Sequence, residues 1–265
     1  MADDASASAG NSPRSEPGGL TPAGPQFIVP DWPAPPKVRA LATTRQSGHG
    51  VGAYASFNLA THVGDDAAIV AANRDLLGEY LPVAPRWLTQ VHGTRCVDAE
   101  TAADGAEADA SFVRSPGRAC AVLTADCLPV LLCNADGTVA AAAHAGWRGL
   151  AAGILESTVA AMRVPGGALV AWLGPAIGPA AFEVGDEVRT NFLRQDAGAI
   201  GAFVSHGDGK WLCDLYALAR RRLARLGVQH ISGGGYCTHA DAARFFSYRR
   251  DGRTGRMATL IWLEP

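Results

Sequence analysis

Short apolar runs alternate with amphipathic stretches along most of the chain. Runs rich in Ala, Val and Leu, bounded by turn residues, predict strands; they cover residues 37–43, 86–92, 95–99, 119–125, 129–133, 138–144, 168–173 and 256–263. Stretches in which apolar residues recur every three or four positions predict helices; they cover residues 66–80, 150–163, 186–195 and 214–226. The Asp136-Gly137 pair between two of the strands predicts a hairpin turn.

This order of elements mixes hairpins with helical crossovers. It argues against one doubly wound parallel sheet and favours an α/β protein with mixed sheets. With 265 residues and 48% hydrophobic content, the chain can bury a sizeable core, and we expect one domain over residues 27–265. Residues 1–26 are rich in Ala, Ser, Pro and Gly, and we expect them to form a disordered tail.

Charge and composition narrow the classes of partner. A net charge of −2 and a pI near 6.4 exclude the broad basic surface that general nucleic-acid binding needs, so small molecules are the expected partners. We find neither a secretory signal nor an apolar run of membrane length, and we expect a soluble, cytoplasmic protein. The six cysteines contain no CxxC pair, which favours reduced thiols over a disulfide framework.

Three segments carry the candidate chemistry, and each places a reactive residue where a predicted strand stops. They are residues 90–93 with His92, residues 124–127 with Cys127, and residues 144–149 with His144. If the strands that end at Cys127 and His144, predicted at 119–125 and 138–144, share a sheet, as the hairpin implies, these two side chains can meet. Two imidazoles and one thiolate are a common ligand set for a catalytic zinc ion with an open fourth position. The spacing matches no local metal motif, so separate structural roles for the three residues stay equally open.

Arginines near glycine-rich turns suggest an anion site. Gly146 to Gly149 open a helix, and Arg148 there could fork onto a phosphate or carboxylate, although a tight turn with a solvated arginine explains the segment equally well. Arg45 ends the first predicted strand. Residues 245–252 combine aromatic faces with two guanidiniums, which suits a planar base and an anion, and also suits core aromatics beside a charged turn.

The motifs in order resemble the YfiH-like laccase-domain family, also called the multicopper polyphenol oxidase or purine nucleoside phosphorylase laccase-domain family. The resemblance runs from about residue 37 to 263 and includes Thr43-Thr44-Arg45, Ser56-Phe57-Asn58-Leu59, His62-Val63-Gly64-Asp65-Asp66, Asn73-Arg74, Gln90-Val91-His92-Gly93, Ala108-Asp109-Ala110, residues 124–129, 144–149 and 174–179, and Phe246-Ser247-Tyr248-Arg249-Arg250-Asp251-Gly252.

The resemblance implies two mixed β-sheets packed between helical layers, a four-layer α/β/β/α arrangement. It also implies metal ligation by His92, Cys127 and His144, usually of zinc. The implied activity is phosphorolysis of adenosine and inosine to free base and ribose 1-phosphate, with methylthioadenosine cleavage and adenosine deamination alongside. An older name of the family makes its members copper oxidases of phenols, so copper is the alternative metal.

The residues favour phosphorolysis over copper oxidation. A multicopper centre needs a larger set of histidines, whereas only two histidines belong to the candidate group and no His-x-His pair is present. We therefore expect catalysis by His92, Cys127 and His144, and binding of purine nucleoside and phosphate by Arg45, Asn58, Arg148 and Arg250. We expect a monomer or a homodimer.

Other functions stay open. Cys127 as nucleophile with His144 as base would make an amide or amidine hydrolase. A module that acts on cell-wall precursors in quality control is a third possibility, without direct support from these residues. A thiolate bound to zinc is neither a free acid nor a free nucleophile, so the sequence leaves open whether Cys127 is a ligand or a catalytic thiol.

Overall fold

Residues 24–265, together with Met1, are described by the computed structural model. Two large sheets form its centre. One has the strand order β1 (Phe27–Ile28), β2 (Val38–Thr43), β16 (Met257–Leu263), β8 (Arg118–Thr124), β3 (Ala84–Arg86). The other has the order β15 (His230–Gly233), β11 (Leu169–Leu173), β9 (Leu128–Asn134), β10 (Ala140–Ala145), β7 (Ala110–Val113), β5 (Cys96–Asp98).

Both sheets are mixed, as the order of elements predicts. In the five-stranded sheet only β3 and β8 are parallel. In the six-stranded sheet the parallel pairs are β11 with β15 and β5 with β7, and the inner pairs are antiparallel. Smaller sheets join β12 (Glu183–Gly185), β14 (Lys210–Cys213) and β13 (Phe203–Ser205), and β4 (Leu88–Thr89) with β6 (Ala106–Glu107).

The two large sheets pack face to face. Strand β9 shows why, because all of its residues are buried and alternate residues enter different cores. Leu131 and Cys133 pack with Val122 and Ile261 of the five-stranded sheet. Val130 and Leu132 point to the opposite face, where helices cover the six-stranded sheet.

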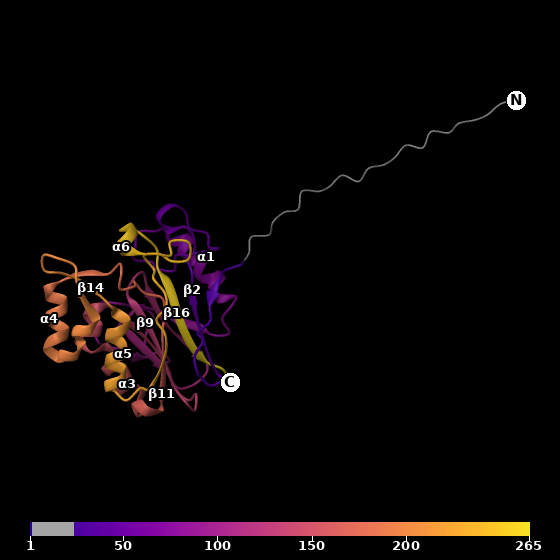
Figure 1. Ribbon diagram of the computed structural model, residues 1–265. Helices are drawn as coiled ribbons and strands as arrows, with labels where there is room; N and C mark the ends of the chain where they lie inside the picture. Colours follow the sequence, from indigo (N-terminus) through magenta and orange to yellow (C-terminus); the bar gives the residue numbers. More distant parts are fainter. Residues whose placement is uncertain (2–23) are drawn as a thin grey trace.

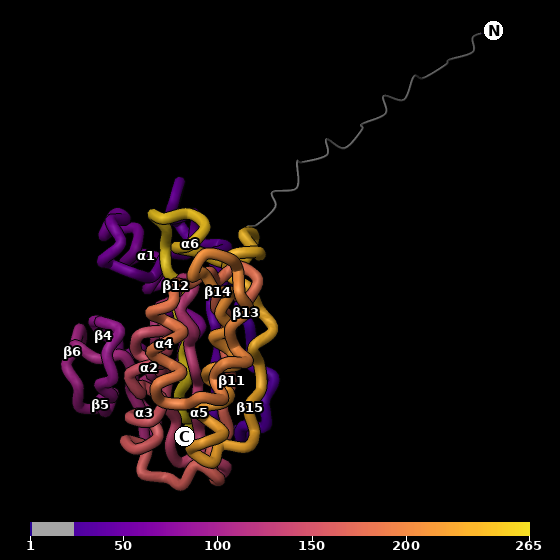
Figure 2. The backbone as a smooth tube through the Cα atoms, turned by 60° about the vertical axis from the view of Figure 1, so that its left-hand side comes forward, coloured from indigo at the N-terminus to yellow at the C-terminus, as the bar shows by residue number. Residues whose placement is uncertain are grey.

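Helices form the two outer layers. The outer face of the six-stranded sheet is covered by α2 (Trp147–Ala152), α3 (Ile154–Met162), α4 (Asp186–Gln195) and α5 (Leu215–Arg225). On the five-stranded sheet, α1 (Ala67–Gly78) packs Leu77 against Phe57 and Leu59. Figure 1 shows α3, α4 and α5 on one side of the strands and α1 on the other, and Figure 2 shows α2 to α5 side by side. The predicted four-layer α/β/β/α class is confirmed.

The helix boundaries have local causes. Asp66 and Asp214 cap α1 and α5, since their carboxylates accept hydrogen bonds from the N–H groups of Ala68 and Ala217. The predicted helix 150–163 is two helices, because Gly153 adopts a left-handed conformation with φ of 107° between α2 and α3. Short 3-10 turns lie at Gly52–Tyr54, Gly166–Ala168 and Ala197–Ala202, and α6 (Tyr248–Asp251) is one short turn near the top of Figure 1.

Two predictions about the strands are wrong. Residues 86–92 do not form one strand: β3 ends at Arg86, β4 covers two residues, and residues 90–93 form a loop. Strands 119–125 and 138–144 do not share a sheet, because β8 belongs to the five-stranded sheet and β10 to the six-stranded one. The hairpin turn at Asp136-Gly137 instead joins β9 to β10, with Gly137 at a φ of 62°.

The predicted disordered tail, residues 1–26, lies mostly outside the described residues. At its end, the Gln26 carbonyl accepts hydrogen bonds from the N–H and hydroxyl of Thr44. That residues 27–265 form one domain stays a prediction. Across the described part of the chain, every helix is too short or too polar to span a bilayer.

Candidate active site and metal centre

The side chains of His92, Cys127 and His144 meet in space. One ring nitrogen from each histidine and Sγ of Cys127 all lie within 4.8 Å of one another. The two imidazole rings are 4.7 Å apart between centroids at an interplanar angle of 72°, and Sγ of Cys127 lies 3.6 Å from Nε2 of His92. The structure therefore brings together the three residues that the sequence predicts: His92 and Cys127 from loops, and His144 from strand β10.

The beginning of β9, rather than the end of β8, brings Cys127 to His144. Cys127 directly precedes β9, whose Leu128 and Pro129 pair with Ala145 and His144 of β10. Gly146 follows β10, and a Cβ at that position would lie 2.9 Å from both Sγ of Cys127 and Cδ2 of His92. A glycine is therefore needed for this close approach.

A buried carboxylate that sequence reasoning did not single out, Asp109, organises the cluster. Its oxygens accept hydrogen bonds from the backbone N–H groups of Val91 (3.2 Å), His92 (2.9 Å) and Gly93 (2.7 Å). The same carboxylate lies 2.8 Å from Nδ1 of His144. Asp109 thus fixes both the loop that carries His92, where His92 has a φ of 60°, and the ring of His144.

The contacts of Asp109 determine the protonation state of His144. Burial opposes ionisation of Asp109, but the hydrogen bonds from His144 and the loop lower its pKa below the usual value. An ionised Asp109 requires Nδ1 of His144 to carry a proton, which leaves Nε2 as the atom directed to the cluster. The only earlier signal for Asp109 was its place in the Ala108-Asp109-Ala110 motif.

Cys127 and His144 stabilise one another in charged form. Burial alone would raise the pKa of Cys127, yet the imidazoles of His144 and His92 lower it to about 6. Burial likewise opposes protonation of His144, but the Cys127 thiolate and the Asp109 carboxylate raise its pKa to about 9. Near neutral pH the metal-free cluster is a thiolate beside an imidazolium.

The donor set fits a transition-metal ion. Imidazole nitrogen and thiolate sulfur are the ligands that zinc prefers, and three protein ligands leave one position open. The hydrogen bond from His144 to Asp109 is the outer contact that a metal-binding histidine usually makes. Among the described residues, this is the one group of three such side chains close enough together to hold a metal ion.

The cluster lies in a cavity of about 550 Å³. That volume is within the range of about 300–1,000 Å³ found for small-molecule sites. Its wall contains apolar and aromatic side chains, namely Leu123, Trp147, Ile177, Phe182 and Tyr248. Its polar wall contains His62, Gln90, Asp126, Arg148, Arg249 and Arg256.

Only one of the four predicted substrate-binding residues lines this cavity. Arg148 does so from α2, where it is exposed and lies 4.5 Å above the ring of Trp147. Arg45 donates hydrogen bonds to the carbonyls of Ala55 and Ala242.

The other two predicted residues are engaged within the chain. Arg250 donates to the carbonyls of Thr238, His239 and Phe245 and pairs with Asp251. Asn58 is fully buried. Substrate contact by Arg45, Asn58 and Arg250 stays a prediction, and the cavity wall instead contains Arg249 and Arg256, which sequence reasoning did not choose.

A family model described as multi-copper polyphenol oxidoreductase laccase matches residues 39–264. The chain belongs to this laccase family. The resemblance that the sequence motifs indicate is therefore confirmed. The name of the family refers to several copper ions, whereas the cluster of His92, Cys127 and His144 offers three ligands, two of them histidines.

Similar curated proteins carry another activity in their names. A purine nucleoside phosphorylase from Pseudomonas aeruginosa is 54% identical over 239 residues, which are 90% of this chain and 98% of that protein. Purine nucleoside phosphorylase YfiH from Escherichia coli is 52% identical over 241 residues, covering 90% of this chain and 99% of its own.

Solved structures of similar proteins share the fold. The crystal structure of protein NMB0706 from Neisseria meningitidis aligns with a TM-score of 0.89 at 52% identity, covering 90% of this chain and 99% of that chain. YlmD from Geobacillus stearothermophilus aligns with a TM-score of 0.78 at 31% identity, covering 87% of this chain and 93% of that chain.

Replacing Asp109 with asparagine should weaken the metal site. The amide keeps one acceptor oxygen for four donors, so we expect a loss of about 1–3 kcal/mol in the free energy of unfolding. We expect metal affinity to fall by about 10–100-fold because His144 loses its outer partner. Denaturant titration measures the change in stability, and metal competition with a chelating dye measures the change in affinity.

The control is Asp75→Asn on the exposed face of α1. Equal metal affinity in the two variants would contradict the role given to Asp109.

In metal-free protein, alkylation of Cys127 should report its lowered pKa. Since the thiolate is the nucleophile, its reaction with iodoacetamide should be slow below pH 6, reach half its maximum near pH 6 and stay fast above it. Peptide mass spectrometry separates Cys127 from the other five cysteines. An unperturbed cysteine thiol has a pKa of about 8.5. A half-maximal rate near that pH would show that the two imidazoles do not stabilise the thiolate.

Proposed function

We propose that the protein is a purine nucleoside phosphorylase. It would cleave adenosine and inosine, and also methylthioadenosine, with inorganic phosphate to free base and ribose 1-phosphate. The observation that carries the proposal is that one cavity combines an acid–base cluster, aromatic faces and guanidiniums that form no ion pair with the described carboxylates. The names of relatives at 54% and 52% identity over nearly their whole length support it.

Each component of the reaction has a matching part of the cavity. A purine is planar and apolar on its faces, and the rings of Trp147, Phe182 and Tyr248 offer surfaces on which it can stack. Phosphate is an anion, and a guanidinium such as that of Arg148 can donate two parallel hydrogen bonds to it. Holding both reactants together lowers the entropic part of the barrier.

The cluster would act where the glycosidic bond breaks. Phosphate attacks the anomeric carbon of ribose as the bond to the base lengthens, so negative charge develops on the departing base and a proton must reach it. When no metal ion is bound, His92, which is exposed to the cavity, can deliver that proton, while Asp109 keeps the His92 loop in place. In that state the charge of the Cys127 thiolate would stabilise the positive ribose ring in the transition state.

We propose zinc as the ion that His92, Cys127 and His144 hold. A bound zinc ion would supply Lewis acidity and would support adenosine deamination as a side activity. The donor set favours zinc over copper centres of the oxidase type, because three ligands cannot build several copper sites. A cytoplasmic location and a monomeric or homodimeric state stay predictions.

One observation favours a second candidate, a Cys–His hydrolase. The carboxylate of Asp109 orients the imidazole of His144, and this imidazole in turn stabilises the thiolate of Cys127. This is the arrangement of a nucleophile, a base and an orienting group. Turnover by metal-free protein, with covalent labelling of Cys127 by a substrate-like electrophile, would favour this candidate over phosphorolysis.

Purified protein should release hypoxanthine from inosine only when phosphate is present. Chromatography detects the base, and ribose 1-phosphate should appear in equal amount. Cys127→Ala should abolish turnover and lower the bound metal, because the cluster loses its thiolate. The matched control is Cys213→Ala, a buried cysteine outside the cavity. Base release that needs neither phosphate nor Cys127 would rule out the proposed reaction.

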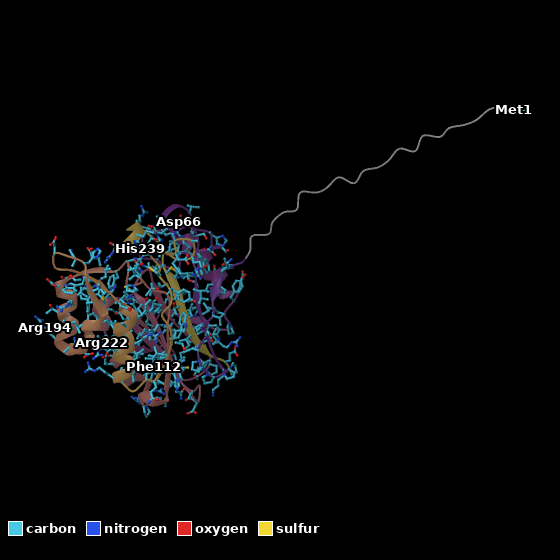
Figure 3. All side chains as sticks on the ribbon, viewed as in Figure 1. Met1, Asp66, Phe112, Arg194, Arg222 and His239 are labelled. Atoms are coloured by element: carbon cyan, nitrogen blue, oxygen red, sulfur yellow. The ribbon has the colours of Figure 1, made fainter. Side chains whose placement is uncertain are left out.

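Arg148→Ala should raise the KM for phosphate while changing kcat little. A hydrogen bond to a charged group contributes roughly 1.5–3 kcal/mol to the free energy of binding, and an exposed guanidinium contributes at the low end of that range. We therefore expect the KM for phosphate to increase by about tenfold. Arg194→Ala, at the outer margin of α4 in Figure 3, is the control for loss of one positive charge. An unchanged KM for phosphate in Arg148→Ala would assign Arg148 a structural role.

A further inference from the structure

Arg256 is a partly buried cation in the cavity wall, and none of the described carboxylates forms an ion pair with it. It directly precedes β16 and lines the cavity that holds the cluster. The arginine ion pairs found within residues 24–265 involve other arginines, on Asp104, Glu156, Asp196, Asp241, Asp251 and Glu264. A cation that is partly withdrawn from water costs free energy when no acidic group pairs with it directly, and an anionic ligand would offset that cost.

The surrounding chain fixes the guanidinium of Arg256 in one position. Its Nη1 donates to the carbonyls of Thr254 and Gly255, both at 2.9 Å. The other N–H groups, on Nε and Nη2, donate to no acceptor within the described part of the chain. This leaves one edge of the guanidinium with two donors, the geometry that recognises a phosphate.

The side chain of Asn58 fixes the backbone of Arg256. Its Oδ1 accepts a hydrogen bond from the backbone N–H of Arg256 at 2.9 Å. Its Nδ2 donates to Asp65 and to the carbonyl of Ala60 at 2.9 Å and 3.1 Å. Gly255 is required beside it, because a Cβ there would lie 2.8 Å from Cβ of Asn58. Asn58, predicted as a substrate-binding residue, thus acts on the cavity through Arg256.

The carboxylate in the cavity wall forms its hydrogen bonds with groups other than Arg256. Asp126 is the nearest carboxylate in the wall, but its two oxygens already accept hydrogen bonds from the Thr238 hydroxyl and the Arg249 N–H, at 2.6 Å and 2.7 Å. Burial lowers the pKa of Arg256, while the charges of Cys127 and Asp126 oppose this. Burial, and then Arg256 and Arg74, lower the pKa of His62, so this wall residue is a neutral N–H donor at pH 7.

The other arginines in the wall are less suited to the task. Nη1 of Arg249 donates to the carbonyl of Glu183 at 2.8 Å, and its guanidinium lies over Phe182. Arg148 is exposed and stacks on the neighbouring Trp147. The guanidinium of Arg256 also lies near an aromatic ring, 5.9 Å from the centroid of Tyr248. Of these three arginines, however, Arg256 is the one that combines partial burial, an orientation fixed by two backbone carbonyls and an open edge.

We propose that Arg256, positioned by Asn58, is the principal anchor for inorganic phosphate in this cavity, with Arg148 as a secondary contact. The inference rests on the proposed function for the part that phosphate plays as co-substrate. The binding of the anion itself is independent of any turnover.

Calorimetric titration with inorganic phosphate tests the anchor directly. The proteins are wild type, Arg256→Gln, Arg256→Lys and the control Arg194→Gln, each as purified and again after metal chelation, so that binding to a metal ion is separated from binding to the arginine. We expect Arg256→Gln to weaken phosphate binding by about 10–100-fold and Arg256→Lys by less, because lysine keeps the charge and loses the fork. Arg194→Gln should bind as the wild type does.

Two results would overturn the anchor: no phosphate binding by the wild type, or equal affinity in wild type and Arg256→Gln. If Arg256→Gln does not fold, Arg256→Lys decides, since equal affinity in that variant excludes a fork on phosphate. The same proteins, assayed with inosine, separate the two proposals. Phosphate binding that depends on Arg256 without any phosphorolysis would refute the proposed function alone. Phosphorolysis with an unchanged KM for phosphate in Arg256→Gln would refute the anchor alone.

Discussion

The site depends on one buried carboxylate. Asp109 is fully inaccessible to solvent, and its charge is stabilised by four donors: three backbone N–H groups of one loop and the ring of His144. Without them, burial of this charge would cost several kcal/mol, which is comparable to the whole free energy of unfolding of a marginally stable protein. The four hydrogen bonds therefore have to form when the carboxylate becomes buried. Once formed, they place His92 beside Cys127 and His144.

The rest of the fold supports this interaction. Asp109 directly precedes β7, which pairs with β10, so that the backbone carbonyl of Asp109 accepts a hydrogen bond from the N–H of His144 at 2.7 Å. Strand β9 lies on the other side of β10 and carries Cys127 at its beginning. Three adjacent strands of the six-stranded sheet thus supply the carboxylate, the imidazole and the thiolate. The loop with His92 is held by its hydrogen bonds to Asp109 and by two hydrogen bonds between the Gln90 side chain and the backbone of Leu123.

Much of the fold could be predicted because buried strands leave a clear pattern. The apolar runs of β8, β9, β10 and β16 are long and bounded by turns, and the Asp136-Gly137 hairpin follows from turn chemistry. The strand predicted at 86–92 is wrong because its backbone turns to reach Asp109, a contact that no local pattern contains. The shared sheet for 119–125 and 138–144 is wrong because the chain crosses between sheets at Ala125 and Asp126.

The cluster was easier to predict than the substrate contacts. Histidine and cysteine residues at turns indicate a reactive site by their residue type alone. An arginine, in contrast, is available to a ligand only if its N–H groups do not already donate to acceptors within the chain. Arg45 and Arg250 donate to backbone carbonyls that lie far away in the sequence or around their own turn, and Arg256 keeps an open edge. This distinction depends on tertiary contacts. Cys127 shows a similar dependence, since its thiolate can serve as a ligand or as a nucleophile according to whether a metal ion is bound.

X-ray absorption at the zinc edge, on protein purified with its metal, tests the central claim most directly. If Asp109 arranges His92, Cys127 and His144 as one ligand set, the spectrum should show one sulfur at about 2.3 Å and two imidazole nitrogens at about 2.0–2.1 Å. A first shell of oxygen and nitrogen atoms alone, without sulfur, would contradict the account.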